Sequence, residues 1–200
     1  TADQMQSVKS WYFESHELKK AMLKGIDLLQ RNITKLREDV NTDPLTSLGN
    51  RRHLEAAITA FQTQQTPFAV VAIDIDHFKQ VNDSFGHDAG DKVLKQLART
   101  MREVSRADDV PCRVGGEEFL LLLPGAPLHS AAQVAERLRA LVEHTELPVV
   151  GRITISLGVA HWPDSDDDMQ AVFKQADAML YAAKRGGRNR GEVAATVEPA

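Results

Sequence analysis

Two adjacent glycines, Gly115 and Gly116, constrain the fold of this chain most. A short extended run, residues 110–114, precedes them, and a strongly apolar run, residues 119–123, follows. This order predicts a β-hairpin, because tight turns use positive φ, which glycine adopts without a steric penalty. Glycine also lets a ligand approach the bare backbone closely. Two glutamates follow the glycines directly, so the turn is either a plain polar hairpin tip or a place where a phosphate or cation binds.

The composition places the chain in a broad class. Its 200 residues are 42% hydrophobic, enough for one core and an appendage. A net charge of −4 argues against nucleic acid as the main partner. The single cysteine, Cys112, excludes an internal disulfide, fits a reducing compartment and is interpreted as a small hydrophobic residue. Without a membrane span or signal peptide in these residues, we expect a cytoplasmic bacterial protein, or the cytoplasmic part of a membrane-anchored one.

The first 42 residues are predicted to form one helix. Apolar residues recur there at alternating steps of four and three, as Met22, Ile26, Leu29, Ile33, Leu36 and Val40. β-branched residues at the a positions favour a parallel two-stranded coiled coil, and hence a homodimer. The alternative is an amphipathic helix lying on its own domain. The pair Asp43-Pro44 ends the helix, because proline disfavours helical geometry in the preceding residue.

We therefore divide the chain into an N-terminal helix (1–42), one domain (43–191) and a tail without regular structure (192–200). The start at Thr1 rather than Met leaves open that the chain is a fragment with an upstream sensory or membrane domain. Within the domain, the run 68–73 is apolar on both faces and predicts a central buried strand. Another strand is expected over 153–160, and helices over 51–64, from about 91 to 104, 129–143 and 169–184. The element order predicts a mixed α/β sheet covered by helices.

Carboxylates follow the expected central strand. Asp74 and Asp76 stand at its end, where α/β sheets present ligand chemistry. If this strand neighbours the hairpin, their oxygens converge with those of Glu117 and Glu118, without His or Cys. Such a set suits Mg²⁺ and similar hard cations. The basic residues Lys79, Lys184, Arg185 and Arg188 would supply positive charge for phosphates, although the last three alone are only a favourable helix C-terminus.

Five blocks in order resemble one family over residues 41–191. The chain is similar to the GGDEF family, the diguanylate cyclases, with the signature in the variant form Gly115-Gly116-Glu117-Glu118-Phe119 that active members also carry. The other matching blocks are residues 43–52, 74–83, 85–91 and 182–189. The resemblance implies an α/β (α+β) fold, ferredoxin-like at its centre, which class III nucleotide cyclases and polymerase palms share.

The resemblance also implies a reaction and a metal. Two GTP molecules would condense to cyclic di-GMP and two pyrophosphates across two facing domains. It places Mg²⁺, with Mn²⁺ as an alternative, on Asp74, the carbonyl of Ile75 and Glu117, with Glu118 nearby. Glu117 would help deprotonate the attacking 3′-hydroxyl, with Glu118 as the second catalytic carboxylate.

The remaining functions are carried over residue by residue. Asn82 and Asp91 would recognise guanine, and the groups that hold the substrate would include Phe78, Lys79, His87, Lys184 and Arg188. The product would inhibit at Arg106 and Asp109, with Arg137 on a second face of that site. A degenerate GTP or cyclic di-GMP receptor is the alternative, but such members lose signature carboxylates, the lysine or the guanine readers, and this chain keeps them all.

Overall fold

The computed structural model describes residues 20, 22–24, 26–28, 40–162 and 169–195. The chain divides into two compact units, Thr1–Val40 and Asn41–Ala200. In the first unit, the described residues between 20 and 28 are helical, and the side chains of Met22 and Ile26 are exposed. Val40, at the end of the expected pattern, is exposed as well, whereas Leu29, Ile33 and Leu36 lie outside the described residues. No helix in the described part of the chain is long and apolar enough to cross a membrane.

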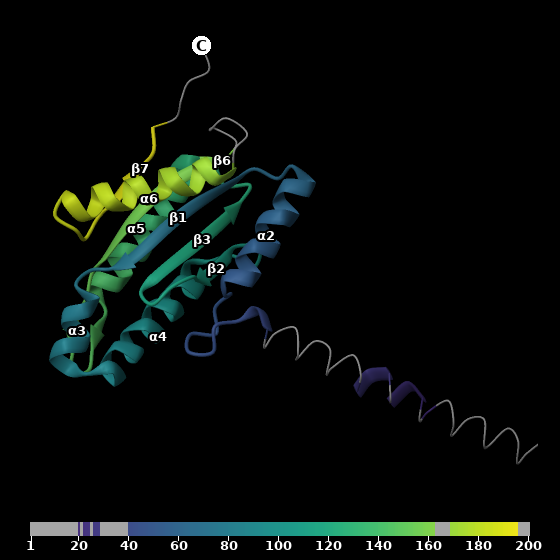
Figure 1. The fold of residues 1–200 in the computed structure, drawn as a ribbon, viewed down its shortest axis with the longest axis horizontal. Helices are drawn as coiled ribbons and strands as arrows, with labels where there is room; N and C mark the ends of the chain where they lie inside the picture. The colour runs from purple at the N-terminus through teal and green to yellow at the C-terminus, as the bar shows by residue number, and fades with distance from the viewer. Residues whose placement is uncertain (1–19, 21, 25, 29–39, 163–168, 196–200) are drawn as a thin grey trace, which may run out of the picture. The chain divides into compact units, whose positions relative to one another are not determined.

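The second unit is built on a five-stranded sheet with the order β2-β3-β1-β6-β7 (Figure 1). All neighbours are antiparallel except β6 and β7. The bounds are β1 Phe68–Ile75, β2 Val110–Arg113, β3 Glu118–Pro124, β6 Ile155–Trp162 and β7 Gly191–Val193. The hairpin β2–β3 and the mixed sheet are therefore confirmed.

Strand β1 lies at the centre, as its sequence predicts. All eight of its residues are buried, because β3 and β6 flank its edges and helices cover both faces. Its odd-numbered apolar side chains pack with α4 (His87–Val104) and α5 (Leu128–His144), and the even-numbered ones pack with α2 (Arg51–Gln64) and α6 (Met169–Arg185). The strand therefore separates two layers of core, and its end is the place where polar side chains first appear.

Helices α2, α5 and α6 begin and end within one residue of the expected ranges. They span Arg51–Gln64, Leu128–His144 and Met169–Arg185. The helix expected from about residue 91 to 104 begins earlier, and the helix that precedes it was not predicted. The chain instead forms α3 (Phe78–Phe85) and α4 (His87–Val104), separated by Gly86 alone. Gly86 has a φ of 81°, which glycine adopts freely and which lets the chain change direction in a single residue.

Three short strands were not predicted. Strands β4 (Glu146–Leu147) and β5 (Gly151–Arg152) pair as a separate two-stranded sheet. Strand β7 extends the main sheet, although residues 192 and 193 were assigned to an irregular tail. Backbone hydrogen bonds hold it there: Leu157 N–H donates to Arg190 O, and Ala194 N–H donates to Val159 O, at 2.9 and 2.8 Å. Residues 196–200 of the expected tail lie outside the described residues.

Candidate active site

The end of β1 and the start of β3 bring carboxylates together. The register pairs Asp74 directly with Glu118, so the condition on which the predicted convergence depended is met. The Asp74 side chain is only 8% exposed, and its Oδ1 accepts from Lys184 Nζ at 2.8 Å. Burial raises the pKa of Asp74; Lys184 opposes the rise, and the charges of Asp76 and Glu118 add to it. A buried carboxylate with one ammonium partner is thus left short of positive charge.

Glu117 lies next to this pair at the tip of the hairpin. Its side chain is partly buried, which raises its pKa, and the negative charges of Asp74 and Glu118 raise it further. Lys184 acts in the opposite direction. The carboxylates of the hairpin and of β1 therefore repel one another, and a cation between them would relieve that repulsion.

The hairpin turn differs from its prediction. Neither Gly115 nor Gly116 has a positive φ, so the expected reason for glycine is wrong. A Cβ on Gly115 would lie 2.3 Å from Glu118 Oε2, whereas one on Gly116 would meet nothing within 4 Å. The turn is held by Arg113, whose Nη2 donates to Gly116 O at 2.8 Å. The absence of a side chain at Gly115 thus makes room for the Glu118 carboxylate, and the space beside Gly116 is unoccupied by other residues.

Asp76 differs in role from Asp74. Its Oδ1 accepts from the Ser156 hydroxyl at 2.7 Å, and its Oδ2 accepts from the Thr154 hydroxyl at 2.7 Å and the Asn189 N–H at 3.0 Å. The residue is 5% exposed, so these donors satisfy a buried charge. Asp76 is therefore committed to protein contacts, and the oxygens left for a ligand belong to the other three carboxylates.

The donor set fits a hard cation held in part by the substrate. The described residues contain no group of three or more His, Cys, Asp or Glu side chains arranged to hold a metal ion. Asp74 and Glu117 nevertheless offer only oxygen donors, and Mg²⁺ is commonly held by one or two carboxylates plus water and substrate phosphates. Ile75, whose carbonyl was a predicted ligand, follows Asp74 as the last residue of β1.

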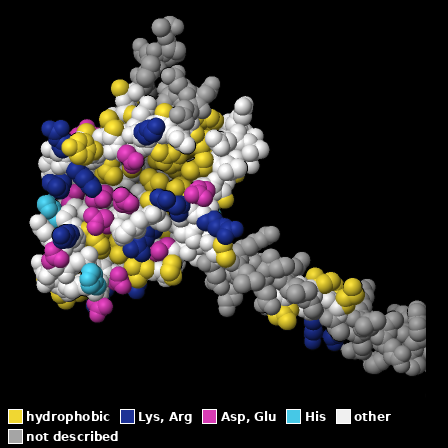
Figure 2. Space-filling model, viewed as in Figure 1, with side chains coloured by type: hydrophobic (Ala, Val, Ile, Leu, Met, Phe, Trp, Pro, Cys, Tyr) yellow, Lys and Arg dark blue, Asp and Glu magenta, His cyan; other side chains and the backbone are white. Residues whose placement is uncertain are grey.

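Basic groups surround the carboxylates. Lys184 and Arg185 form the last turn of α6, and Arg188 follows as an exposed residue. Phe78 and Lys79 open α3, which has no side-chain cap, so its first N–H groups remain available. Figure 2 shows acidic and basic side chains gathered over the region where Figure 1 places the ends of α6 and β1. This mixture of charges suits a metal-bound polyphosphate.

The predicted guanine readers come from α3 and α4. The side chain of Asn82 lies against Gly90, because a Cβ at residue 90 would lie 2.0 Å from Asn82 Oδ1. Asp91 is the next residue of α4, so the two polar side chains belong to one small region. His87 is the exposed first residue of α4.

The three residues predicted for product binding line one cavity of about 270 Å³, together with Asp108. Asp109 Oδ2 accepts from the backbone N–H of Arg106 at 2.7 Å, so the Arg-x-x-Asp segment is a turn rather than a side-chain ion pair. Arg137 Nη2 donates to Val104 O at 2.8 Å, at the end of α4. In the described residues, no ion pair engages the Arg106 guanidinium, which leaves it able to bind an anion.

Two features of the site were not predicted. Asp177 of α6 lies near Glu118; partial burial raises the pKa of Asp177, and the charge of Glu118 raises it further. Its spacing of seven residues from Lys184 places both on one face of α6, a helical signal that was readable in the sequence. The hydrogen bonds of Thr154, Ser156 and Asn189 to Asp76 carried no such signal, because they join distant segments.

Comparison with known proteins identifies the class of domain. The family described as diguanylate cyclase, GGDEF domain, matches residues 40–190, and the chain belongs to this family. Diguanylate cyclase DgcP of Pseudomonas aeruginosa is 42% identical over 165 residues, which cover 79% of this chain and 24% of that protein. The chain spans less than half of the length of the curated relatives that it matches.

Solved structures agree with this assignment. The coiled coil and GGDEF domain of DgcB from Caulobacter crescentus, in complex with c-di-GMP, is 32% identical with a TM-score of 0.76, over 90% of this chain and 98% of that one. The active GGEEF domain of a diguanylate cyclase from Vibrio cholerae is 34% identical with a TM-score of 0.67, over 75% and 98% of the two chains. The predicted family and fold class are confirmed.

The buried charge of Asp74 leads to a prediction about stability. Its raised pKa means that ionisation at pH 7 is less favourable in the folded than in the unfolded chain, so Asp74→Asn should raise the melting temperature measured without divalent ions or nucleotide. The gain should shrink as the pH falls through the raised pKa and disappear below 3.8, where the carboxyl is protonated in both states. Asp83→Asn, at an exposed position, is the control. A lower melting temperature for Asp74→Asn at pH 7 would contradict the electrostatic account.

Proposed function

We propose that this chain is a diguanylate cyclase, which condenses two GTP to cyclic di-GMP and two pyrophosphates. The observation that carries the proposal is the pairing of Asp74 with Glu118, beside Glu117 and Lys184, in a GGDEF-family fold. Relatives of 42% and 41% identity are named diguanylate cyclases. The signature variant of this chain is the one named in the Vibrio cholerae structure.

Asp74, Glu117 and the Ile75 carbonyl would hold Mg²⁺, or Mn²⁺ in its place, with Glu118 nearby. When bound, the cation would neutralise phosphate charge and lower the pKa of the attacking 3′-hydroxyl. Glu117 receives the proton of the 3′-hydroxyl of one GTP as the general base. The 3′-oxygen bonds to the α-phosphorus of the other GTP, and the bond to the pyrophosphate oxygen breaks.

The other residues bind and orient the nucleotide. Lys79, Lys184 and Arg188 hold the β- and γ-phosphates, together with the N–H groups of Phe78 and Lys79. Asp91 accepts hydrogen bonds from the guanine ring N–H and amino group, which adenine does not present in that arrangement, and Asn82 contacts the same edge. His87 is the first residue of α4 and lies four residues before Asp91 on the same helix. The ratio of GTP to ATP use by variants at Asn82 and Asp91 measures this role.

Product inhibition is proposed for the cavity at Arg106. A guanidinium can bind a phosphate or a guanine edge through two parallel hydrogen bonds, and Asp109 can accept from guanine N–H groups. The same cavity favours the second candidate function, a cyclic di-GMP receptor without catalysis. The retained carboxylates, lysine and guanine readers favour the enzyme.

The first prediction from this proposal concerns Glu117. Glu117→Gln removes a metal ligand and the base at an accessible hairpin tip, so cyclic di-GMP formation should fall by roughly 100-fold or more while the fold is kept. The measurement is nucleotide separation after incubation with GTP and Mg²⁺, with circular dichroism to monitor the fold. Glu55→Gln, on the exposed surface of α2, is the control. Product formation at a near wild-type rate would remove Glu117 from the mechanism.

The second prediction concerns Arg106. Arg106→Ala should weaken cyclic di-GMP binding by roughly tenfold or more, the size expected for one or two charged hydrogen bonds, and should leave the initial rate unchanged. Calorimetry with cyclic di-GMP and progress curves of turnover measure the two effects. Arg99→Ala, at an exposed position of α4, is the control. Binding of equal strength in the Arg106 variant would show that the product site lies elsewhere.

The third prediction concerns assembly. One domain offers half of the reaction, so two GTP-loaded domains must face each other, and we propose that the N-terminal helices pair to bring them together. The exposed side chains of Met22 and Ile26 support this proposal. Deleting residues 1–40 should lower the rate per chain at dilute protein, and a higher protein concentration should restore much of it. A monomeric deletion variant with an undiminished rate across that range would exclude the helix as the dimer interface.

A further inference from the structure

The loop between α6 and β7 has an unusual backbone. Arg188 and Asn189 both have positive φ, at 64° and 49°. Asparagine adopts this left-handed region more readily than most residues, whereas an arginine rarely does, and two such residues in succession are uncommon. The loop carries Arg188, which the proposed function places on the triphosphate. A local hydrogen bond from Arg188 N–H to Ala183 O, at 3.0 Å, holds the start of the loop to α6, and contacts with other elements hold Asn189.

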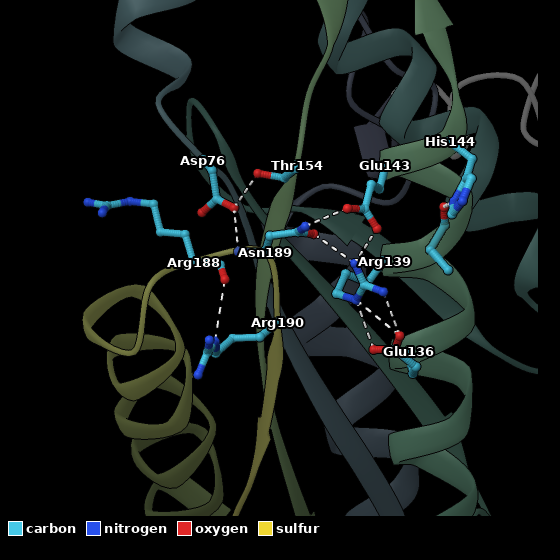
Figure 3. Close-up of polar contacts among 10 residues, drawn as sticks. Asp76, Glu136, Arg139, Glu143, His144, Thr154, Arg188, Asn189 and Arg190 are labelled. Carbon is cyan, nitrogen blue, oxygen red and sulfur yellow. Dashed lines mark hydrogen bonds and ion pairs between the residues drawn. The ribbon is translucent and has the colours of Figure 1, made fainter.

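Asn189 supplies those contacts with its whole amide group. Its Nδ2 donates to Glu143 Oε1 at 2.7 Å, and its Oδ1 accepts from Arg139 Nη1 at 2.8 Å (Figure 3). Its backbone N–H donates to Asp76 Oδ2 at 3.0 Å. Asn189 thus joins two residues of α5 to the buried carboxylate that follows β1.

The two α5 residues are themselves paired. Arg139 Nη1 donates to Glu143 Oε2 at 2.7 Å, and Arg139 also binds Glu136 through Nε and Nη2. Hydrogen bonds from Arg139 and then from Asn189 lower the pKa of Glu143, so its carboxylate is charged at neutral pH. The Arg139 side chain is only 15% exposed. The contacts to Asn189 are therefore made by charged partners that are fixed on a helix.

We propose that Arg139 and Glu143 are positioning residues for nucleotide binding: they fix Asn189, and thereby the exposed side chain of Arg188, toward the phosphates. In Figure 3 the Asn189 side chain points toward α5, while the Arg188 side chain points away from it. Anchoring one residue of the loop to α5 thus fixes the direction in which its neighbour extends. This inference rests on the proposed role of Arg188. It does not require any residue of α5 to contact the nucleotide.

The test uses binding of a nucleotide that cannot react. 3′-Deoxy-GTP lacks the attacking hydroxyl, so its affinity is measurable by calorimetry with Mg²⁺ on the full chain. Glu143→Gln should weaken this affinity roughly tenfold, because a misaligned contact loses much of its strength. Glu136→Gln is the matched control, since Glu136 binds the same arginine but makes no hydrogen bond to Asn189. GMP, which lacks the β- and γ-phosphates, should bind both variants like the wild type.

Two further variants separate positioning from general damage. In Asn189→Gly, glycine adopts the left-handed backbone readily but has no side-chain amide. This variant should lower the affinity for 3′-deoxy-GTP as much as Glu143→Gln does. In an Arg188→Ala background, Glu143→Gln should have no additional effect, because its action passes through Arg188. Three results would overturn the proposal. Glu136→Gln could lower the affinity for 3′-deoxy-GTP as much as Glu143→Gln, Glu143→Gln could lower the affinity for GMP equally, or the losses of affinity from Arg188→Ala and Glu143→Gln could add up in the double variant. A chain that binds 3′-deoxy-GTP as expected but forms no cyclic di-GMP would refute the proposed function and leave this inference standing.

Discussion

The site depends on the pairing of β1 with a different strand on each side. β3 brings Glu118 opposite Asp74, and β6 brings Ser156 opposite the same residue. A strand buried on both faces has nowhere to place a charge except at its end, because burial of an unpaired carboxylate is very unfavourable. The carboxylates of β1 are therefore found where its apolar run stops. Antiparallel pairing then guarantees that this end meets the beginning of β3 and of β6.

The second constraint is Arg113, which ties the start of the domain to the hairpin turn. Its Nη1 lies 3.2 Å from Asp43 Oδ1, and its Nη2 donates to Gly116 O. Burial raises the pKa of Asp43, but hydrogen bonds from Thr46 and Arg113 outweigh it and leave the pKa below its usual range. One arginine thus connects the residues that follow the N-terminal helix with the loop that presents Glu117. The turn keeps its shape through this contact rather than through left-handed glycines.

The sequence predicted the parts of the fold that local pattern determines. The run that is apolar on both faces predicted the central position of β1, and helical periodicity predicted α2, α5 and α6. The prediction that Cys112 is a small hydrophobic residue is confirmed, since it is fully buried and burial raises its pKa to about 12. Helix α3 and the first turn of α4 were missed because their polar residues, and Gly86 between the two helices, are typical of turns. Strand β7 was missed because three residues carry no periodicity and pair only through a neighbour distant in sequence.

The roles of the two β1 carboxylates could not be predicted either, and the difference between them explains the design of the site. Asp74 and Asp76 are both buried, stand two residues apart and look equivalent in the sequence. Asp76 receives hydrogen bonds from three residues on two segments and holds the loop after α6, whereas Asp74 has one lysine and carboxylates around it. The first arrangement stabilises the fold and commits both oxygens of Asp76 to protein contacts. In the second arrangement, the negative charge around Asp74 is only partly balanced, and a bound cation with its phosphates would balance the rest. A rigid, satisfied carboxylate next to an unsatisfied one is therefore how this fold keeps a binding site preorganised without losing the strand that carries it.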